Sequence, residues 1–353
     1  MPFLRGSRER RQLFFFLLIL LISLPVCLYA GNPELIARSR SQWTGVAVTG
    51  EGRLFVSFPA WGKGFLFPLG EVAGGEVLRF EPRDRKTGER ITLSNAQSLR
   101  GGAEGLIWIL DNANPDFKGV RFPGPRLLAV DVESGLLVSE YRFSKESYKK
   151  NSYLNDFCIY TKQAEAYVSD SGTGGIVVMD LESGESRRYL DGTPSVTAET
   201  STLNIGGSPF RITSHVNGIA LDKRKGALYY SALSGHTLYR IPVSAFQIPF
   251  VHGALFSVLV EPQGRIPASD GMIIDLHGRL WITGVETGRI WVVIPHQGAK
   301  DLFPGFSVSW PDSLAEDSRS LYLTSSDIQG RDGFYELYRL PLSRESQPSE
   351  ERE

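Results

Sequence analysis

The chain has very few Cys residues, almost no net charge and a single long apolar run. Its 353 residues include only 2 Cys, Cys27 and Cys158, which excludes a disulfide framework and a cysteine-based zinc site. Cys158 lies in an apolar stretch, so we expect a buried, unreactive thiol. Lys and Arg number 38 against 39 Asp and Glu, and this balance argues against nucleic acid as a partner. No Gly-x-Ser-x-Gly, P-loop or dinucleotide-binding motif occurs.

The one long apolar run lies at the N-terminus. Several Arg residues precede an apolar stretch over residues 13–24, Pro25 ends it, and Ala30 supplies a small residue before Gly31. This order predicts a secretory signal peptide over residues 1–30, with an uncleaved membrane anchor as the alternative. We therefore expect a secreted or periplasmic monomer that meets no membrane beyond this segment.

Turn residues and aromatic residues are abundant, and one strand pattern recurs. The chain has 37 Gly, 20 Pro and 11% aromatic residues, a mixture typical of β proteins. Six short apolar strands end in a hydroxyl residue or Asp and begin 41 to 62 positions apart: LFVS at 54, IWILD at 107, AYVSD at 166, LYYS at 228, LWIT at 280 and LYLT at 321. Further apolar segments flank each copy. The repeat predicts an all-β protein, a single six-bladed β-propeller over residues 31–345, followed by a disordered tail over residues 346–353.

A polar residue lies 9 to 11 positions before each copy of the strand, where the innermost strand of a blade would begin. These residues are Thr44, Gln97, Asn155, Asn217, Asp270 and Asp312. Inner strands line the central channel, so we expect the six side chains to form a ring at its mouth. Such a ring suits Ca²⁺ or another divalent cation, or a polar small molecule. The alternative is structural, because Asn and Asp often cap turns at the start of a strand. We take Asn155, Asn217, Asp270 and Asp312 as the candidate binding site.

Four blocks of the chain resemble the yellow / major royal jelly protein family. They are IWILD at 107–111, SYLNDF at 152–157 with AYVSDSG at 166–172, HVNGIAL at 215–221 with LYYSALSGHTLY at 228–239, and WPDSL at 310–314 with LYLTS at 321–325. The resemblance extends over residues 43–340 and implies a secreted six-bladed β-propeller. Members of that family are linked to dopachrome conversion, to the binding of small amines and to nutrient storage, so the resemblance implies a fold more sharply than a function. The insect members are typically richer in Cys than this chain.

A more distant similarity connects the ring to gluconolactonase / senescence-marker propellers. It rests on the pairs Asn155-Asp156, Asn217-Gly218 and Asp270-Gly271. The similarity implies that Asn217 and Asp270 are metal ligands and that Asn155 contacts metal or substrate. Those enzymes also take a Glu from the first blade, whereas the matching stretch here, WTGV at 43–46, has none. Asp312 is a candidate to supply that charge.

Two further features bear on the channel mouth. His215 lies two residues before Asn217 and is a candidate for proton transfer, with packing in a turn as the alternative. Residues 193–214 form the longest stretch without a clear strand pattern, and we expect a loop that covers the mouth. The six Trp residues are expected to pack between blades rather than to form a ligand cage. Three functions stay open: small-molecule binding at the mouth, a cation-assisted lactonase-like hydrolysis or a tautomerisation, and a non-catalytic scaffold.

Overall fold

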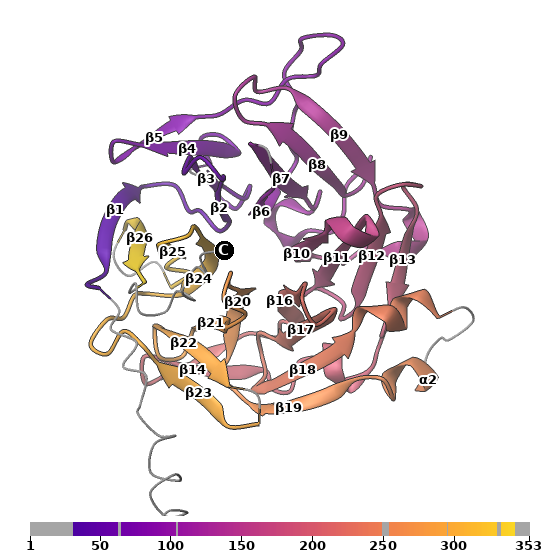
Figure 1. Cartoon of the computed structure of the whole chain (residues 1–353), viewed down its shortest axis with the longest axis vertical. Helices are drawn as coiled ribbons and strands as arrows, with labels where there is room; N and C mark the ends of the chain where they lie inside the picture. The colour runs from indigo at the N-terminus through magenta and orange to yellow at the C-terminus, as the bar shows by residue number, and fades with distance from the viewer. Residues whose placement is uncertain are drawn as a thin grey trace, which may run out of the picture.

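Six four-stranded antiparallel sheets surround a central channel, as in a six-bladed β-propeller (Figure 1). The computed structural model describes residues 31–62, 65–103, 105–248, 254–294, 296–329 and 333–342. Five sheets are continuous in the chain. They consist of β2 (Val46–Val48), β3 (Leu54–Ser57), β4 (Leu69–Ala73) and β5 (Glu76–Arg79); β6 (Ala96–Gly101), β7 (Leu106–Asp111), β8 (Arg126–Asp131) and β9 (Leu137–Arg142); β10 (Leu154–Tyr160), β11 (Glu165–Asp170), β12 (Ile176–Asp180) and β13 (Ser186–Tyr189); β16 (Val216–Asp222), β17 (Ala227–Ala232), β18 (Thr237–Pro242) and β19 (Glu261–Arg265); and β20 (Ser269–Ile274), β21 (Leu280–Gly284), β22 (Arg289–Ile294) and β23 (Gly298–Asp301).

The sixth sheet closes the ring by joining the two ends of the propeller. It contains β24 (Pro311–Glu316), β25 (Ser320–Ser325) and β26 (Tyr335–Pro341), and its outermost strand is β1 (Glu34–Ser39). Strand β1 runs antiparallel to β26, with Glu34 opposite Arg339 and Ser39 opposite Tyr335. The all-β six-bladed prediction is therefore confirmed.

The second strand of each blade is the element that the sequence repeat detected. In β3, β11, β17, β21 and β25 every residue is buried. A strand covered on both faces reads as a continuous apolar run rather than as an alternating pattern. This is why these strands stood out, while the half-exposed outer strands did not.

The hydrophobic core is divided among the interfaces between neighbouring blades. One cluster, for example, joins Tyr167 and Ile176 of the third blade to Ile219 and Leu228 of the fourth. Five further clusters join the remaining neighbours around the ring in the same way. Trp43 and Trp281 are fully buried in two of these interfaces, as the sequence predicted for the Trp residues. Burial between the blades therefore stabilises the ring and fixes the inner strands around the channel.

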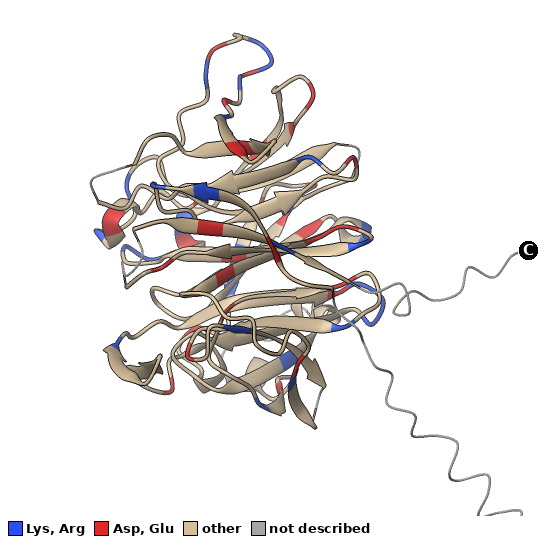
Figure 2. Cartoon of the chain, turned by 90° about the vertical axis from the view of Figure 1, so that its left-hand side faces the viewer, with Lys and Arg blue, Asp and Glu red and all other residues tan. Residues whose placement is uncertain are grey.

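Few elements lie outside the blades. Among the described residues they are five 3-10 turns, the one-turn helix α2 (Ala254–Ser257) and a hairpin of β14 (Thr202–Ile205) and β15 (Ser208–Arg211). None of the helices in the described part of the chain is long and apolar enough to cross a membrane. Acidic and basic residues are interspersed over the blades (Figure 2). The predicted signal peptide, residues 1–30, and the predicted tail, residues 346–353, lie outside the described residues.

Candidate functional site

The predicted ring residues stand at irregularities in the inner strands. In β6, β10, β16, β20 and β24 the pairing with the second strand shifts at Gln97, Asn155, Asn217, Asp270 and Asp312 or at the residue that follows them. A β-bulge bends the strand and redirects a side chain that regular pairing would place on one face of the sheet. These bulges turn the ring side chains towards the mouth of the channel.

Hydroxyl groups of the second strands hold the bulges in place. In three blades the hydroxyl accepts a backbone N–H of the inner strand and donates to the carbonyl of the ring residue in the next blade. The contacts are Gly45 N–H to Ser57 Oγ (3.0 Å) and on to Gln97 O (3.2 Å), Asp156 N–H to Ser169 Oγ (3.1 Å) and on to Asn217 O (2.6 Å), and Ser313 N–H to Thr324 Oγ1 (3.1 Å) and on to Thr44 O (2.6 Å). The hydroxyl that ends the repeated strand therefore links one blade to the ring position of the next.

Five of the six ring residues line one cavity of about 220 Å³ at the channel mouth. They are Gln97, Asn155, Asn217, Asp270 and Asp312. Thr44 is the exception, because its buried hydroxyl donates to the carbonyl oxygen of Gln97 (2.6 Å) instead of facing the cavity. The structure thus brings together all four candidate residues chosen from the sequence.

Two buried carboxyl groups lie at one side of this cavity. Asp270 accepts the indole N–H of Trp310 (2.6 Å), and Asp312 accepts the hydroxyls of Ser326 (2.6 Å) and Ser313 (3.0 Å). Burial is the main reason that the pKa of Asp270 is raised to about 6, and repulsion from nearby Asp156 adds to the rise. Burial and the neighbouring Asp270 likewise raise the pKa of Asp312 well above its usual range.

An ion pair lies deeper in the channel, beneath the cavity. Arg100 pairs with Asp156, and its guanidinium also donates to Phe157 O (2.9 Å) and Leu314 O (3.3 Å). The side chains of Arg100 and Asp156 are 16% and 6% exposed, so this pair is shielded from water. The sequence analysis gave neither residue a role, although Asp156 is part of the Asn155-Asp156 pair that resembles the gluconolactonase propellers.

An aromatic wall faces the carboxyl groups from the first three blades. Phe117 stacks on Tyr153 with ring centroids 4.4 Å apart, and Trp61 lies 5.2 Å from Phe117. The Tyr153 hydroxyl donates to Gln97 Oε1 (2.6 Å) and accepts the Trp61 indole N–H (2.8 Å). All three aromatic residues line the cavity. Trp61 therefore makes the contacts between blades that the sequence predicted for the Trp residues, and it also lines the cavity.

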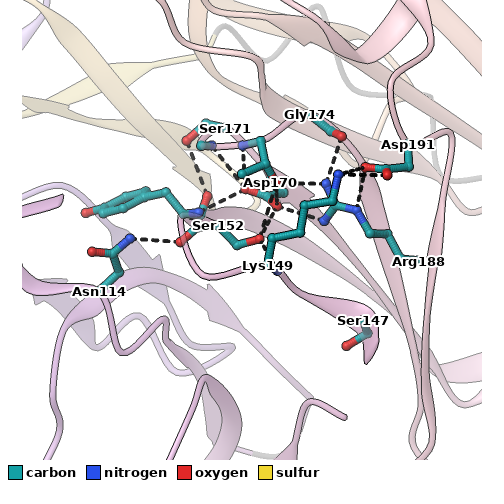
Figure 3. Close-up of polar contacts among 12 residues, drawn as sticks. Asn114, Ser147, Lys149, Ser152, Asp170, Ser171, Gly174, Arg188 and Asp191 are labelled. Carbon is teal, nitrogen blue, oxygen red and sulfur yellow. Dashed lines mark hydrogen bonds and ion pairs between the residues drawn. The ribbon is translucent and has the colours of Figure 1, made fainter. Parts of the chain in front are cut away.

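A polar network behind the cavity holds the end of the loop that precedes β10, which we call the mouth loop and which contains Ser152 and Tyr153 (Figure 3). The fully buried carboxylate of Asp170 accepts Ser152 Oγ–H (2.6 Å), Tyr153 N–H (2.9 Å) and the Arg188 guanidinium (2.7 Å). Burial alone would favour the neutral acid, but Arg188 and the hydroxyl donors hold the pKa of Asp170 below its usual range. Asp170 is thus a charged anchor for the mouth loop.

The segment over residues 193–214 reaches the mouth, but it is not the featureless loop that the sequence suggested. It contains the hairpin β14–β15, whose Phe210 packs edge-on against Trp310 with ring centroids 5.6 Å apart. Ile212, Thr213 and Ser214 then line the cavity. The alternation of small polar residues with single apolar ones in this hairpin is too short to give a recognisable strand pattern.

His215 does not join the site. It is absent from the cavity lining, and its Nδ1 accepts the backbone N–H of Ala198 (3.0 Å). Burial lowers the pKa of His215, which favours the neutral ring that this contact requires. The packing alternative therefore describes its position in the structure.

The cavity partly meets the needs of a divalent cation. Asn217 and Asp270, the predicted metal ligands, both line the cavity and come from the neighbouring inner strands β16 and β20. Hard cations take six or more oxygen ligands. The first blade supplies no carboxylate at the ring position, where the Thr44 hydroxyl donates to Gln97 O. In the described residues, no group of three His, Cys, Asp or Glu side chains is arranged to hold a metal. Asp270 and Asp312 already accept hydrogen bonds from an indole N–H and from two hydroxyls, so a ligand with N–H or O–H donors is compatible with them.

Solved structures of known proteins share this fold. A gluconolactonase from Xanthomonas campestris is 14% identical with a TM-score of 0.52, and the match covers 86% of this chain and 87% of that one. Regucalcin from Agrobacterium tumefaciens, described as a calcium-binding protein, is 14% identical with a TM-score of 0.53, over 89% of this chain and 96% of that one. At these identities the likeness concerns the fold.

Sequence comparison is more specific. Major royal jelly protein 3 of Apis mellifera is 22% identical over 200 residues, which cover 54% of this chain and 36% of that protein. The chain therefore matches about a third of the length of this relative. The model of the family described as major royal jelly protein matches residues 100–298, which is more than half of the 353 residues and contains three of the six inner strands, β10, β16 and β20. The chain belongs to the major royal jelly protein family.

Proposed function

We propose that the channel mouth binds a small aromatic amine in its protonated form. One observation carries the proposal: two buried carboxyl groups, Asp270 and Asp312, line the cavity, and its described lining contains no Lys or Arg. A buried carboxylate without a counter-charge is strongly unfavourable, so it either keeps a proton or meets a cation. A ligand ammonium group supplies both the charge and the hydrogen-bond donors.

The rest of the cavity supports the aromatic half of this ligand. Trp61, Phe117 and Tyr153 present a wall on which an aromatic ring can stack, and Asn155 and Gln97 offer polar contacts beside it. A cavity of about 220 Å³ suits a ligand of one ring and a short side chain. The N-terminal pattern and the family membership support export, so we propose that this binding takes place outside the cytoplasm.

Isothermal titration calorimetry at pH 7.5 tests the proposal with phenethylamine, its uncharged analogue 2-phenylethanol, and calcium chloride. We expect phenethylamine to bind and 2-phenylethanol to bind at least about 30-fold more weakly, because loss of a buried charge partner costs about 2 kcal/mol or more. The same loss is expected for Asp312→Asn. Asp180→Asn, which changes an exposed residue at the end of β12 and outside this cavity, is the matched control. Equal affinity for the amine and the alcohol contradicts the proposal.

Two enzymatic alternatives are tested alongside. Proton transfer in a bound substrate is favoured by the position of Asp270 and by its pKa of about 6, which is near the range that general acid-base catalysis requires. Turnover of dopachrome that is lost in Asp270→Asn and kept in Asp180→Asn would establish it. A divalent cation held by Asn217 and Asp270, as the lactonase resemblance implies, would appear as calcium binding in the same calorimetric series. Absence of binding by every probe would favour the scaffold alternative.

A further inference from the structure

The Arg100–Asp156 pair divides the channel into two compartments. The Arg100 guanidinium starts from β6 in the second blade, donates to Phe157 O (2.9 Å) in the third blade and reaches Leu314 O (3.3 Å) in the sixth. Since these acceptors lie on opposite sides of the ring, the side chain crosses the channel. The mouth cavity lies on one side of this crossing, and the far ends of the inner strands lie on the other.

A second cavity of about 140 Å³ lies at those far ends. Its lining comes from the inner strands of the second to fifth blades and from the turn after β16. The lining includes Arg100, Lys223, Met272, Ile273 and Ile274. We call this space the lower cavity. It shares no lining residue with the mouth cavity.

The lower cavity has the opposite chemistry to the mouth. Its described lining has two cationic side chains, Arg100 and Lys223, and no acidic one. Apolar side chains make up most of the wall: Met272 is fully buried, whereas Ile273 and Ile274 are only partly covered. Partly covered apolar side chains in a concavity gain free energy when an apolar ligand group excludes water from them.

Lys223 is the cation that remains available. Arg100 already pairs with Asp156 and donates to two carbonyl groups. Lys223 is exposed, and within the described residues it makes no ion pair. Its neighbour Lys225 instead pairs with Asp222 (3.3 Å). An exposed ammonium group beside an apolar pocket complements a ligand with an anionic head and an apolar body.

We propose that the lower cavity is a second binding site, for a small amphipathic carboxylate whose alkyl part lies against Ile273 and Ile274, beside the buried Met272, and whose carboxylate pairs with Lys223. The proposal is independent of the amine site, because the two cavities lie on opposite sides of the Arg100 crossing.

The methionine content of the chain allows a direct test. The sequence has 3 Met, namely Met1, Met179 and Met272, so a protein labelled with ¹³C at the methionine methyl groups gives at most three methyl signals. Met272 lines the lower cavity, and Met179 is fully buried between the second and third blades, where it serves as an internal control. We expect sodium hexanoate to shift the Met272 signal in a saturable way and to leave the Met179 signal in place. Hexylamine at the same concentration is expected to have little effect.

Two substitutions separate the charge from the pocket. Lys223→Gln should weaken hexanoate binding roughly fivefold, the value of an exposed ion pair of about 1 kcal/mol. Lys225→Gln is the matched control and should bind hexanoate as the unmodified chain does. The proposal is overturned if hexanoate leaves the Met272 signal unchanged, if hexylamine shifts it as strongly, or if Lys223→Gln binds hexanoate with unchanged affinity.

Discussion

Replacing Asp270 by Asn should stabilise the protein at neutral pH. Asp270 is 7% exposed, and burial raises its pKa from the usual 3.8 to about 6. Between these two pH values the folded chain binds a proton at this site that the unfolded chain has released. The free energy of unfolding therefore falls as the pH rises through this window, and it stays low above pH 6.

The magnitude follows from the size of the shift. Each pH unit is worth about 1.4 kcal/mol, so a rise of about two units corresponds to about 3 kcal/mol. Asn keeps an oxygen that can accept the Trp310 indole N–H and has no charge to lose. We expect Asp270→Asn to match the unmodified protein near pH 4 and to be about 3 kcal/mol more stable at pH 7.

Urea unfolding at several pH values between 4 and 8 measures this difference. Asp180→Asn is the control for the sign, because hydrogen bonds from the backbone of Ser183 and Glu182 lower the pKa of exposed Asp180. Its titration lies below pH 4, so Asp180→Asn should show no gain in stability over the unmodified protein between pH 4 and 8. If Asp270→Asn and the unmodified protein are equally stable at pH 7, burial of the charged Asp270 does not lower the free energy of unfolding and the reasoning is refuted.

Three further perturbations test the parts that build the site. Asp170→Ala leaves Arg188, 7% exposed, without its buried partner and should cost about 3 to 5 kcal/mol in urea unfolding, whereas Asp191→Ala, whose side chain is 44% exposed, should cost less than about 1 kcal/mol. Thr324→Val removes the link from the sixth blade to Thr44 O and should cost about 2 kcal/mol, because two buried backbone groups lose their partner; an unchanged melting temperature would contradict this role. Trp61→Ala should weaken phenethylamine binding roughly tenfold by calorimetry and leave propylamine binding nearly unchanged.

The sequence predicts those elements of the fold that are buried on both faces, because burial requires apolar residues along the whole strand. The second strands are covered on both faces, so β11 and β17 read as clear apolar runs and their repetition gives the number of blades. The ring position then follows by counting back from each run. Closure by β1 could only be expected, because an outer strand such as ELIARS is half exposed and carries no pattern of its own.

The candidate site shows a similar division. Asn155, Asn217, Asp270 and Asp312 were found because each stands 9 to 11 positions before a repeated strand. The aromatic wall was missed, since Trp61 and Phe117 lie in loops of different blades and nothing in their spacing links them. A useful signal was available for Tyr153, which is two residues before Asn155, as His215 is before Asn217. The two residues occupy equivalent positions but have different contacts: Tyr153 lines the cavity, whereas His215 accepts a hydrogen bond from Ala198 in the segment over residues 193–214.

A crystal structure of the protein with phenethylamine would test the central claim most directly. The account predicts the ammonium group within hydrogen-bond distance of Asp270 or Asp312 and the ring against Phe117. A ligand bound elsewhere, or one whose ring rather than its ammonium group faces the two carboxyl groups, would contradict it.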